Sequence, residues 1–298
     1  MFDSLSRGWG FFKQAVDMAM KDRDLIKPSI YSFFANAVVG FVFAIPIVIA
    51  VFIFGGEDNF VGRGVIGILG AILLFAQYTV TYVFSGMTVY LIYGYLSEGD
   101  GQMDKAWAVI KRDFLDIMSL AAASALVKVV ENTLRGRGKR RNVIGGLVAN
   151  ILDTVWTTAT YFVLPAMVIE DLNLWNALKR ATNMIKNNLL LVGVGYVGVS
   201  VINGVIGGSV IFVAILIAVG IAFALGSLGS AALIVGIVVG VVLVVLVSGI
   251  VQVFTSYIGT AYHTCLFIWA RDAEKAQQAG QSVQAVRAPA PLAAVLGR

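Results

Sequence analysis

The stretch that decides the fold runs from Asn187 to Ala270 and reads NNLLLVGVGYVGVSVINGVIGGSVIFVAILIAVGIAFALGSLGSAALIVGIVVGVVLVVLVSGIVQVFTSYIGTAYHTCLFIWA. It holds no Asp, Glu, Lys or Arg. A helix of a soluble domain needs a polar outer face, whereas a charge at the centre of a bilayer costs about 2.5–3.5 kcal/mol. The stretch is therefore predicted to lie in a membrane. Because one crossing takes about 20 residues, it must fold back at least once, and Gly226-Ser-Leu-Gly-Ser230 is the expected turn.

The composition of the whole chain indicates the same class. Of its 298 residues, 59% are hydrophobic and 13% are charged, against about 25% charged in soluble domains. The formal net charge is +5, but most basic residues flank apolar segments, where they set topology and contact anionic lipid head groups. Nucleic acid is therefore not expected as a partner. Cys265 is the only cysteine, so neither an internal disulfide nor a cysteine-based metal cluster is expected.

The sequence predicts one all-α, polytopic membrane domain over residues 1–275, with four transmembrane helices. Spans are expected at 30–54 and 65–95, and two more in 189–270. Residues 1–28 and 170–188 place apolar side chains at helical spacing on one face, which is typical of helices lying at the membrane surface. Residues 1–28 lack the continuous apolar core of a cleavable signal. The tail, 276–298, is rich in Ala, Gln and Pro and is expected to be mobile and cytoplasmic.

Residues 104–164 leave two interpretations open. The apolar core from Ile117 to Val127 is short for a crossing, and Val143 to Leu164 carries a polar stripe. The two segments could cross as two further spans, or they could form an amphipathic hairpin largely on the cytoplasmic side. In the second case all of the 22 Lys and Arg residues except Arg63 lie on the inner side, which agrees with the positive-inside rule and is favoured. Either case gives an even number of crossings, so both termini are expected to be cytoplasmic, in a bacterial-type inner membrane.

One short pattern occurs three times, as a Trp followed by a Lys four residues later. The pairs are Trp9 and Lys13, Trp107 and Lys111, and Trp175 and Lys179, and each precedes a hydrophobic segment. We expect the three tryptophans to anchor surface helices among the lipid head groups. A threefold duplication of a unit made of one surface helix and one helical hairpin is the alternative origin of the pattern.

Polar residues inside the apolar segments define the candidate sites. Asn150, Asp153 and Thr157 recur at helical spacing and form a candidate ion path or polar seam, because an ionisable group within a membrane segment usually has a function. The basic turn, with Arg135, Arg137, Lys139, Arg140 and Arg141, is a candidate contact for anionic lipid or an acidic partner. His263 and Cys265 lack neighbouring ligands or bases in the sequence, so no catalytic, metal or cofactor site is expected.

Two stretches resemble a known family. Arg7-Gly-Trp-Gly-Phe-Phe-Lys13, with Lys21-Asp-Arg-Asp-Leu-Ile26 and Pro28, is similar to the start of a prokaryotic multi-spanning membrane family catalogued only as a domain of unknown function. Tyr161-Phe-Val-Leu-Pro165, Val168-Ile-Glu170 and Ala177-Leu-Lys-Arg180 resemble its central motif, although Ala181 stands where the family often has Ser. The resemblance implies a polytopic protein without an assigned activity.

The favoured function at this stage is a structural or assembly role without a chemical reaction. Surface helices are abundant, and the sequence shows few polar constellations in its apolar segments. The expected partners are the bilayer, anionic head groups and either a second copy of the chain or another membrane protein. A channel or transporter that uses the polar stripe around Asp153 is the alternative.

Overall fold

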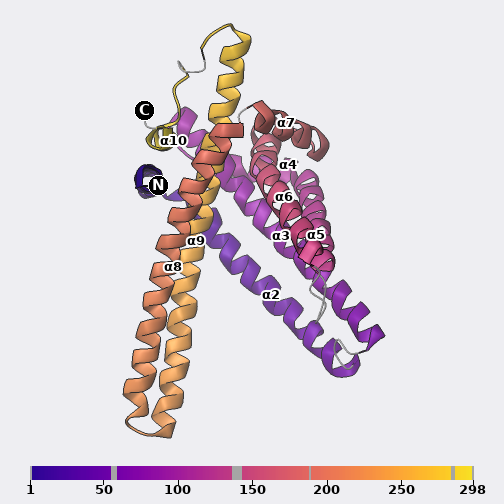
Figure 1. Ribbon diagram of the computed structural model, residues 1–298, viewed down its shortest axis with the longest axis vertical. Coiled ribbons are helices and arrows are strands. Elements are labelled where there is room, and N and C mark those ends of the chain that lie inside the picture. The colour runs from indigo at the N-terminus through magenta and orange to yellow at the C-terminus, as the bar shows by residue number, and fades with distance from the viewer. Residues whose placement is uncertain (1, 55–58, 136–142, 188, 283–285, 297–298) are drawn as a thin grey trace.

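The fold is all-α. A computed structural model describes residues 2–54, 59–135, 143–187, 189–282 and 286–296. These residues form helices in the order α1 (Phe2–Lys21), the short 3-10 helix η1 (Arg23–Leu25), α2 (Lys27–Phe54), α3 (Phe60–Glu98), α4 (Met103–Arg112), α5 (Phe114–Arg135), α6 (Val143–Glu170), α7 (Leu174–Asn187), α8 (Leu189–Gly226), α9 (Ser230–Gln278) and α10 (Ala290–Leu296). Figure 1 shows them with the long axis vertical.

Five helical segments within the described residues are long and apolar enough to cross a membrane. They are Arg23–Phe54, Phe60–Glu98, Ile144–Glu170, Gly204–Gly226 and Ser230–Gln278. Four of them correspond to the four spans expected from the sequence, and the expected turn at Gly226–Ser230 separates α8 from α9. The remaining segment, Ile144–Glu170, lies in α6, the second half of the expected hairpin. The first half, α5, is not among the five segments that could cross a membrane. How deeply the hairpin enters a membrane therefore stays a prediction.

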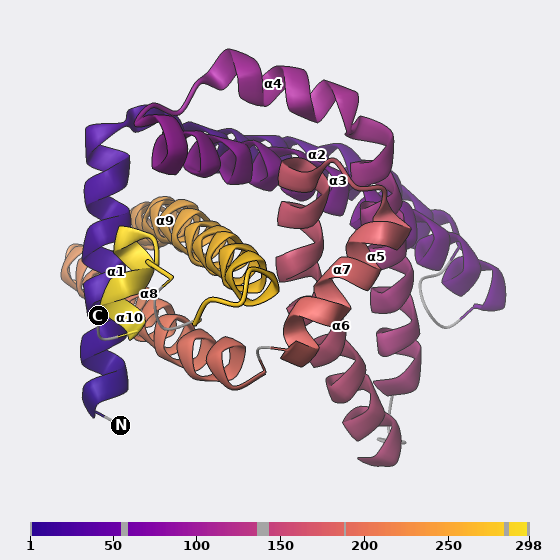
Figure 2. The ribbon, with the colours of Figure 1, turned by 90° about the horizontal axis from the view of Figure 1, so that it is seen from above.

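Three antiparallel helix pairs make up most of the molecule: α2 with α3, α5 with α6, and α8 with α9. A helix that carries one of the Trp and Lys pairs precedes each of them, namely α1, α4 and α7. Seen from above, these three helices lie lengthwise in the view (Figure 2), and Figure 1 shows them toward the end of the molecule that also carries both termini. The order of elements therefore repeats three times as one lying helix followed by one hairpin, the arrangement that the repeated motif suggested.

The packing of α8 on α9 explains two glycines. A Cβ atom at Gly236 would lie 2.9 Å from Cα of Ala222, and one at Gly240 would lie 3.0 Å from Cβ of Ala218. These small residues therefore let the two helix backbones approach closely within one chain. On either side of the Gly226–Ser230 turn, both helices expose most of their described Val, Ile and Leu side chains. By contrast, α9 from Val253 to Ala270 is largely buried in the body of the protein.

Two segments show features that the sequence analysis did not predict. Residues 104–131 are divided at Asp113, where α4 ends and α5 begins. The backbone N–H of Asp113 donates a hydrogen bond to the carbonyl of Val109, at the end of α4. The carbonyl of Asp113 accepts a hydrogen bond from the backbone N–H of Ile117, in the first turn of α5. Part of the tail, whose mobility stays a prediction, forms α10, which packs on α1 and buries Leu292. Pro291 is tolerated there because the N–H groups of a first helical turn have no helical partner.

Candidate functional site

A cavity of about 600 Å³ lies between α3, α5, α6, α8 and α9. Its walls carry three charged side chains, from Lys128, Glu131 and Asp153, together with a series of aromatic rings and hydroxyls. In a protein built from membrane-type helices, such a concentration of polar groups around one cavity is a functional candidate. The cavity has two ends: the tip end lies toward Arg135 and Val143, where α5 ends and α6 begins, and the other end lies toward the chain termini.

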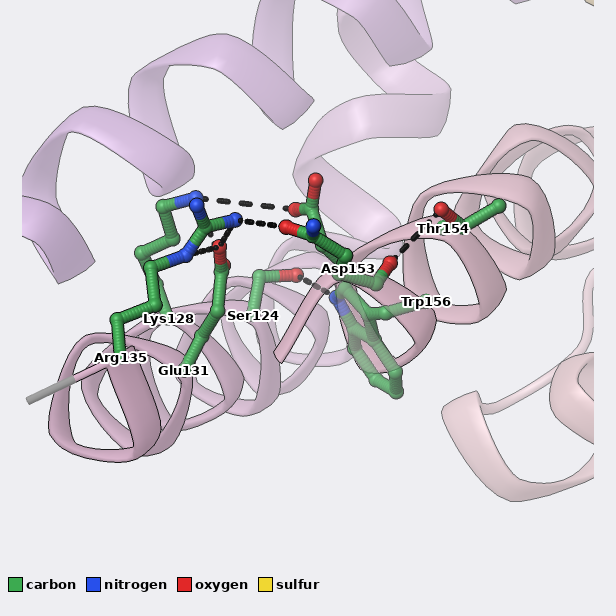
Figure 3. Close-up of polar contacts among 8 residues, drawn as sticks. Ser124, Lys128, Glu131, Arg135, Asp153, Thr154 and Trp156 are labelled. Carbon is green, nitrogen blue, oxygen red and sulfur yellow. Dashed lines mark hydrogen bonds and ion pairs between the residues drawn. The ribbon is translucent and has the colours of Figure 1, made fainter. Parts of the chain in front are cut away.

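At the tip end, one ion pair and one hydrogen bond join α5 to α6 (Figure 3). Glu131 is 1% exposed and accepts hydrogen bonds from Nζ of Lys128 at 2.7 Å and from Nε of Arg135 at 2.9 Å. Arg135 also donates to the amide oxygen of Asn150 in α6, at 2.8 Å. Nζ of Lys128 lies 3.7 Å from Oδ1 of Asp153. Two cations therefore balance two carboxylates, which offsets the large cost of placing charge away from water.

In the middle of the cavity, the Ser124 hydroxyl holds two aromatic side chains in place. It lies 2.8 Å from the hydroxyl of Tyr82 in α3, and the indole Nε1–H of Trp156 in α6 donates to it at 3.0 Å. Ser124 is 2% exposed. One buried hydroxyl on α5 thus connects α3 and α6, and it fixes the rings that line the cavity.

At the end nearest the termini, the cavity is closed by buried side chains. Val89, Leu164 and Tyr262 line this end, and each is buried. The rings of Tyr161 and His263 stack beside them with centroids 3.5 Å apart. His263 also forms a hydrogen bond with the backbone of Gly259, one turn earlier in α9. No charged residue among those described lines this end of the cavity, so the charges are confined to the tip end.

Beyond the closed end, Arg180 of α7 ties α6 to α9. Its guanidinium donates to both carboxylate oxygens of Glu170, at 2.9 and 3.2 Å, and to Oε2 of Glu274. The three side chains are between 14% and 26% exposed. Burial alone would lower the pKa of Arg180, but its hydrogen bonds with the two carboxylates outweigh burial and raise that pKa above its ordinary value. The cluster carries one net negative charge.

The polar stripe predicted from the sequence faces α5. Asp153 and Thr157 line the cavity, and Asn150 lies one turn away, bonded to Arg135. Sequence reasoning missed Lys128 and Glu131, although the spacing of Lys128, Glu131 and Arg135 by three and four residues places them on one helical face. It also gave His263 no role, whereas His263 lines the cavity and Cys265 is buried in the core.

The other predicted residues lie outside the cavity. Of the basic turn only Arg135 belongs to the described residues; Arg137, Lys139, Arg140 and Arg141 lie outside them. Trp9, Trp107 and Trp175 are all exposed, at 44%, 42% and 66%. Each has the Lys four residues later above its ring, with Nζ 5.4, 6.0 and 5.3 Å from the centroid. Each of the three helices also buries small or apolar residues on its other side, such as Ala15, Ala106 and Ala177.

Comparison with known proteins shows which family the chain belongs to. Residues 64–276 match a family described as a family of unknown function, DUF6159. The chain belongs to that family. The match includes the cavity, α8 and nearly all of α9. It begins after the motif around Trp9, so that motif lies outside the matched residues. The search of curated proteins gave no match.

Proposed function

We propose that this protein carries a small polar solute across a membrane and uses the cavity as its binding site. The observation that carries the proposal is the cavity itself: charged at its tip end, lined by hydroxyls in the middle and closed by buried side chains at the other end. A site closed on one side is suited to a carrier that alternates between two openings rather than to a continuous pore. The proposal involves no chemical reaction on the solute.

The lying helices support a placement of the membrane. α1, α4 and α7 share one end of the molecule and each exposes a Trp with a Lys above its ring (Figure 2). Trp prefers the head-group layer, and Lys prefers the anionic cytoplasmic leaflet. We place this end, with both termini, at the cytoplasmic face of an inner membrane. The last turn of α2, the first turn of α3 and the α8–α9 turn then lie toward the opposite face.

In this placement the α5–α6 hairpin enters from the cytoplasmic side and turns back. In Figure 1 its described ends point toward the same side as the lower ends of α2 and α3 but do not reach as far. Its outer surface is apolar, with Leu126, Val130, Ile144, Ile151 and Val155 exposed. Lys128, Glu131 and Asp153 of the hairpin instead line the cavity. A hairpin of this kind is tolerated at membrane depth where it lines a water-filled cavity.

A flux assay tests the proposed function. The full chain, reconstituted in vesicles, should raise permeability to at least one class of small polar solute in stopped-flow shrinking and swelling measurements. Asp153→Asn should reduce that rise at least tenfold, whereas Asp104→Asn, on the exposed side of α4, should leave it unchanged. Vesicles that match protein-free vesicles for amines, carboxylates, neutral solutes and monovalent ions would contradict the proposal.

Cysteine labelling tests the membrane placement separately. The native Cys265 is fully buried and should not react. With an impermeant thiol reagent on intact cells, Asn59→Cys should be labelled, whereas Asp104→Cys and Asn183→Cys should be labelled only after permeabilisation. Labelling of Asp104→Cys from outside would reverse the orientation.

A structural or assembly role is the second candidate, and one observation favours it. α8 and α9 extend well beyond the body of the protein as a separate pair, and most of their apolar side chains are uncovered (Figure 1). Such a surface could pack against a second copy of the chain as well as against lipid. Detergent-extracted protein that sizes as a single large ring or sheet, with no solute flux in vesicles, would favour this role over transport.

A further inference from the structure

We propose that the cavity binds a solute bearing a protonated amine, with the ammonium group on Asp153. This inference rests on the proposed function, because it names the solute class of the same site. The alternatives are an anionic solute, a neutral one and a bare inorganic cation. The charges and ring faces of the cavity decide among them.

The two carboxylates of the cavity, Glu131 and Asp153, differ in how well cations of the protein compensate their charge. Glu131 is almost fully buried and binds both Lys128 and Arg135. Lys128 lies 2.7 Å from Glu131 but 3.7 Å from Asp153, so its ammonium is committed to Glu131. Asp153 is 47% exposed, and Lys128 is the one cation that approaches it among the described residues. The carboxylate of Asp153 is thus the least compensated charge in the cavity, and it is negative.

A second observation concerns the rings beside this carboxylate. Tyr82 and Trp156 direct their polar atoms to Ser124, so the surfaces that they offer to the cavity are chiefly ring surfaces. Tyr78 stacks on Tyr82 with centroids 5.8 Å apart and also lines the cavity. The negative face of an aromatic ring attracts ammonium groups, and Trp does so most strongly. A bare metal ion would gain less from such walls, because it prefers several oxygen ligands at short distance.

A third observation concerns hydrogen bonding. The Thr160 hydroxyl donates its proton to the backbone carbonyl of Thr157, at 2.8 Å. It also forms a side-chain hydrogen bond with Tyr82, so Thr160 is bonded within the protein. The ligand preference of the cavity therefore rests on the Asp153 carboxylate and on the ring faces, which together are complementary to an ammonium group with N–H donors. They are a poor match for a carboxylate or phosphate, which Asp153 would repel.

A series of three probes of the same shape tests the inference. These are 3-phenylpropylammonium, 3-phenylpropanol and 3-phenylpropanoate, and their binding to the detergent-solubilised full chain is measured by equilibrium dialysis. The ammonium probe should bind at least tenfold more tightly than the alcohol, and the carboxylate most weakly. Equal binding of all three, tightest binding of the carboxylate, or displacement of the ammonium probe by low millimolar sodium would overturn the inference.

Variants assign the preference to Asp153. Asp153→Asn should weaken binding of the ammonium probe at least tenfold and leave the alcohol unchanged, whereas Asp153→Glu should retain most of the preference. Asp104→Asn is the matched control. Unchanged ammonium binding in folded Asp153→Asn would also overturn the inference, and the probe series on the native chain decides it even if that variant misfolds. The dialysis assay measures binding and does not depend on transport. If the protein prefers the ammonium probe but shows no flux in vesicles, only the transport proposal is refuted. If it carries other solutes but does not prefer the ammonium probe, only the proposed solute class is refuted.

Discussion

Arg180 binds Glu274 across 94 positions of the chain, and its other side holds both carboxylate oxygens of Glu170. One side chain of α7 thus joins the last residue of α6 to the part of α9 beyond His263. These helices form two walls of the cavity, and the cluster lies beyond its closed end. Opening that end would require α6 and α9 to separate, and therefore would require Arg180 to release at least one carboxylate.

The first prediction is that Arg180→Ala destabilises the protein. Two partly buried carboxylates would face each other without their cation, and removing one partner of a buried ion pair costs about 3–5 kcal/mol. Because a quarter of the Arg180 side chain is exposed, we expect about 2–3 kcal/mol, seen as a lower thermal unfolding midpoint in detergent.

A matched control and a rescue sharpen this test. Lys179→Ala changes an exposed neighbour on the same helix and should stay within about 0.5 kcal/mol. Adding Glu274→Gln to Arg180→Ala should recover part of the loss, since it removes one of the opposed charges. Arg180→Lys should recover less than half, because a lysine cannot hold both oxygens of Glu170 in a fork. Equal stability of Arg180→Ala and Lys179→Ala would contradict the role assigned to Arg180.

The second prediction concerns Ser124. Replacing it with Ala removes the partner of two buried polar groups, the Tyr82 hydroxyl and the Trp156 indole N–H. A buried donor left without an acceptor costs about 1–3 kcal/mol. Ser124→Ala should therefore lower the unfolding midpoint and alter the fluorescence of Trp156. Ser119→Ala, a serine of α5 that bonds only within its own helix turn, is the control and should change little. A drop of the same size in both variants would assign the effect to α5 as a whole.

Much of the fold could be predicted from the sequence, because the distribution of charged and apolar residues along the chain decides which helices can lie in a membrane. The absence of charge between Asn187 and Ala270 was enough to indicate two long membrane helices, and two glycines with two serines marked their turn. The break at Asp113 was not predicted, because Ile110 and Ile117 are buried on either side of it and continue the apolar pattern. An apolar pattern reports which residues are buried, whereas the end of α4 depends on backbone bonds at a single residue.

The candidate site was predicted only in part, for a similar reason. Asn150, Asp153 and Thr157 could be recognised because they interrupt an apolar segment. Lys128 and Glu131 lie in a short segment where charge looked ordinary, and only the packing of α5 on α3 and α6 shows that Glu131 is buried. The pairing of Arg180 with Glu170 joins two residues of the motif that resembled the family, yet its bond to Glu274 depends on how distant helices meet.

The third prediction separates packing within the hairpin from association between copies. Gly236→Ala would place a methyl group 2.9 Å from the backbone of Ala222, so α8 and α9 would have to move apart. Overpacking of this kind costs about 1–3 kcal/mol. Gly220→Ala, where nothing lies within 4 Å of the added Cβ, should be neutral or slightly stabilising. Should Gly236→Ala keep the native unfolding midpoint but change the size of the detergent-extracted particle, the glycine would belong to an interface between copies.

The last prediction distinguishes the two carboxylates of the α5–α6 ion network. Glu131→Gln would leave Lys128 and Arg135 facing a neutral amide in a buried position, so we expect a loss of about 2–4 kcal/mol in stability. Asp153→Asn removes a half-exposed charge whose partner keeps a closer carboxylate, so its stability should change by less than about 1 kcal/mol. Ligand binding should show the reverse order. Glu131→Gln frees Lys128 to pair with Asp153, so any such protein that folds should lose only part of the preference for the ammonium probe, whereas Asp153→Asn should lose all of it. Thermal unfolding and equilibrium dialysis on the same preparations compare the two effects directly. If Asp153→Asn were the more destabilising change, Asp153 would be a structural member of the network, and the cavity would lack the weakly compensated negative charge that amine binding needs.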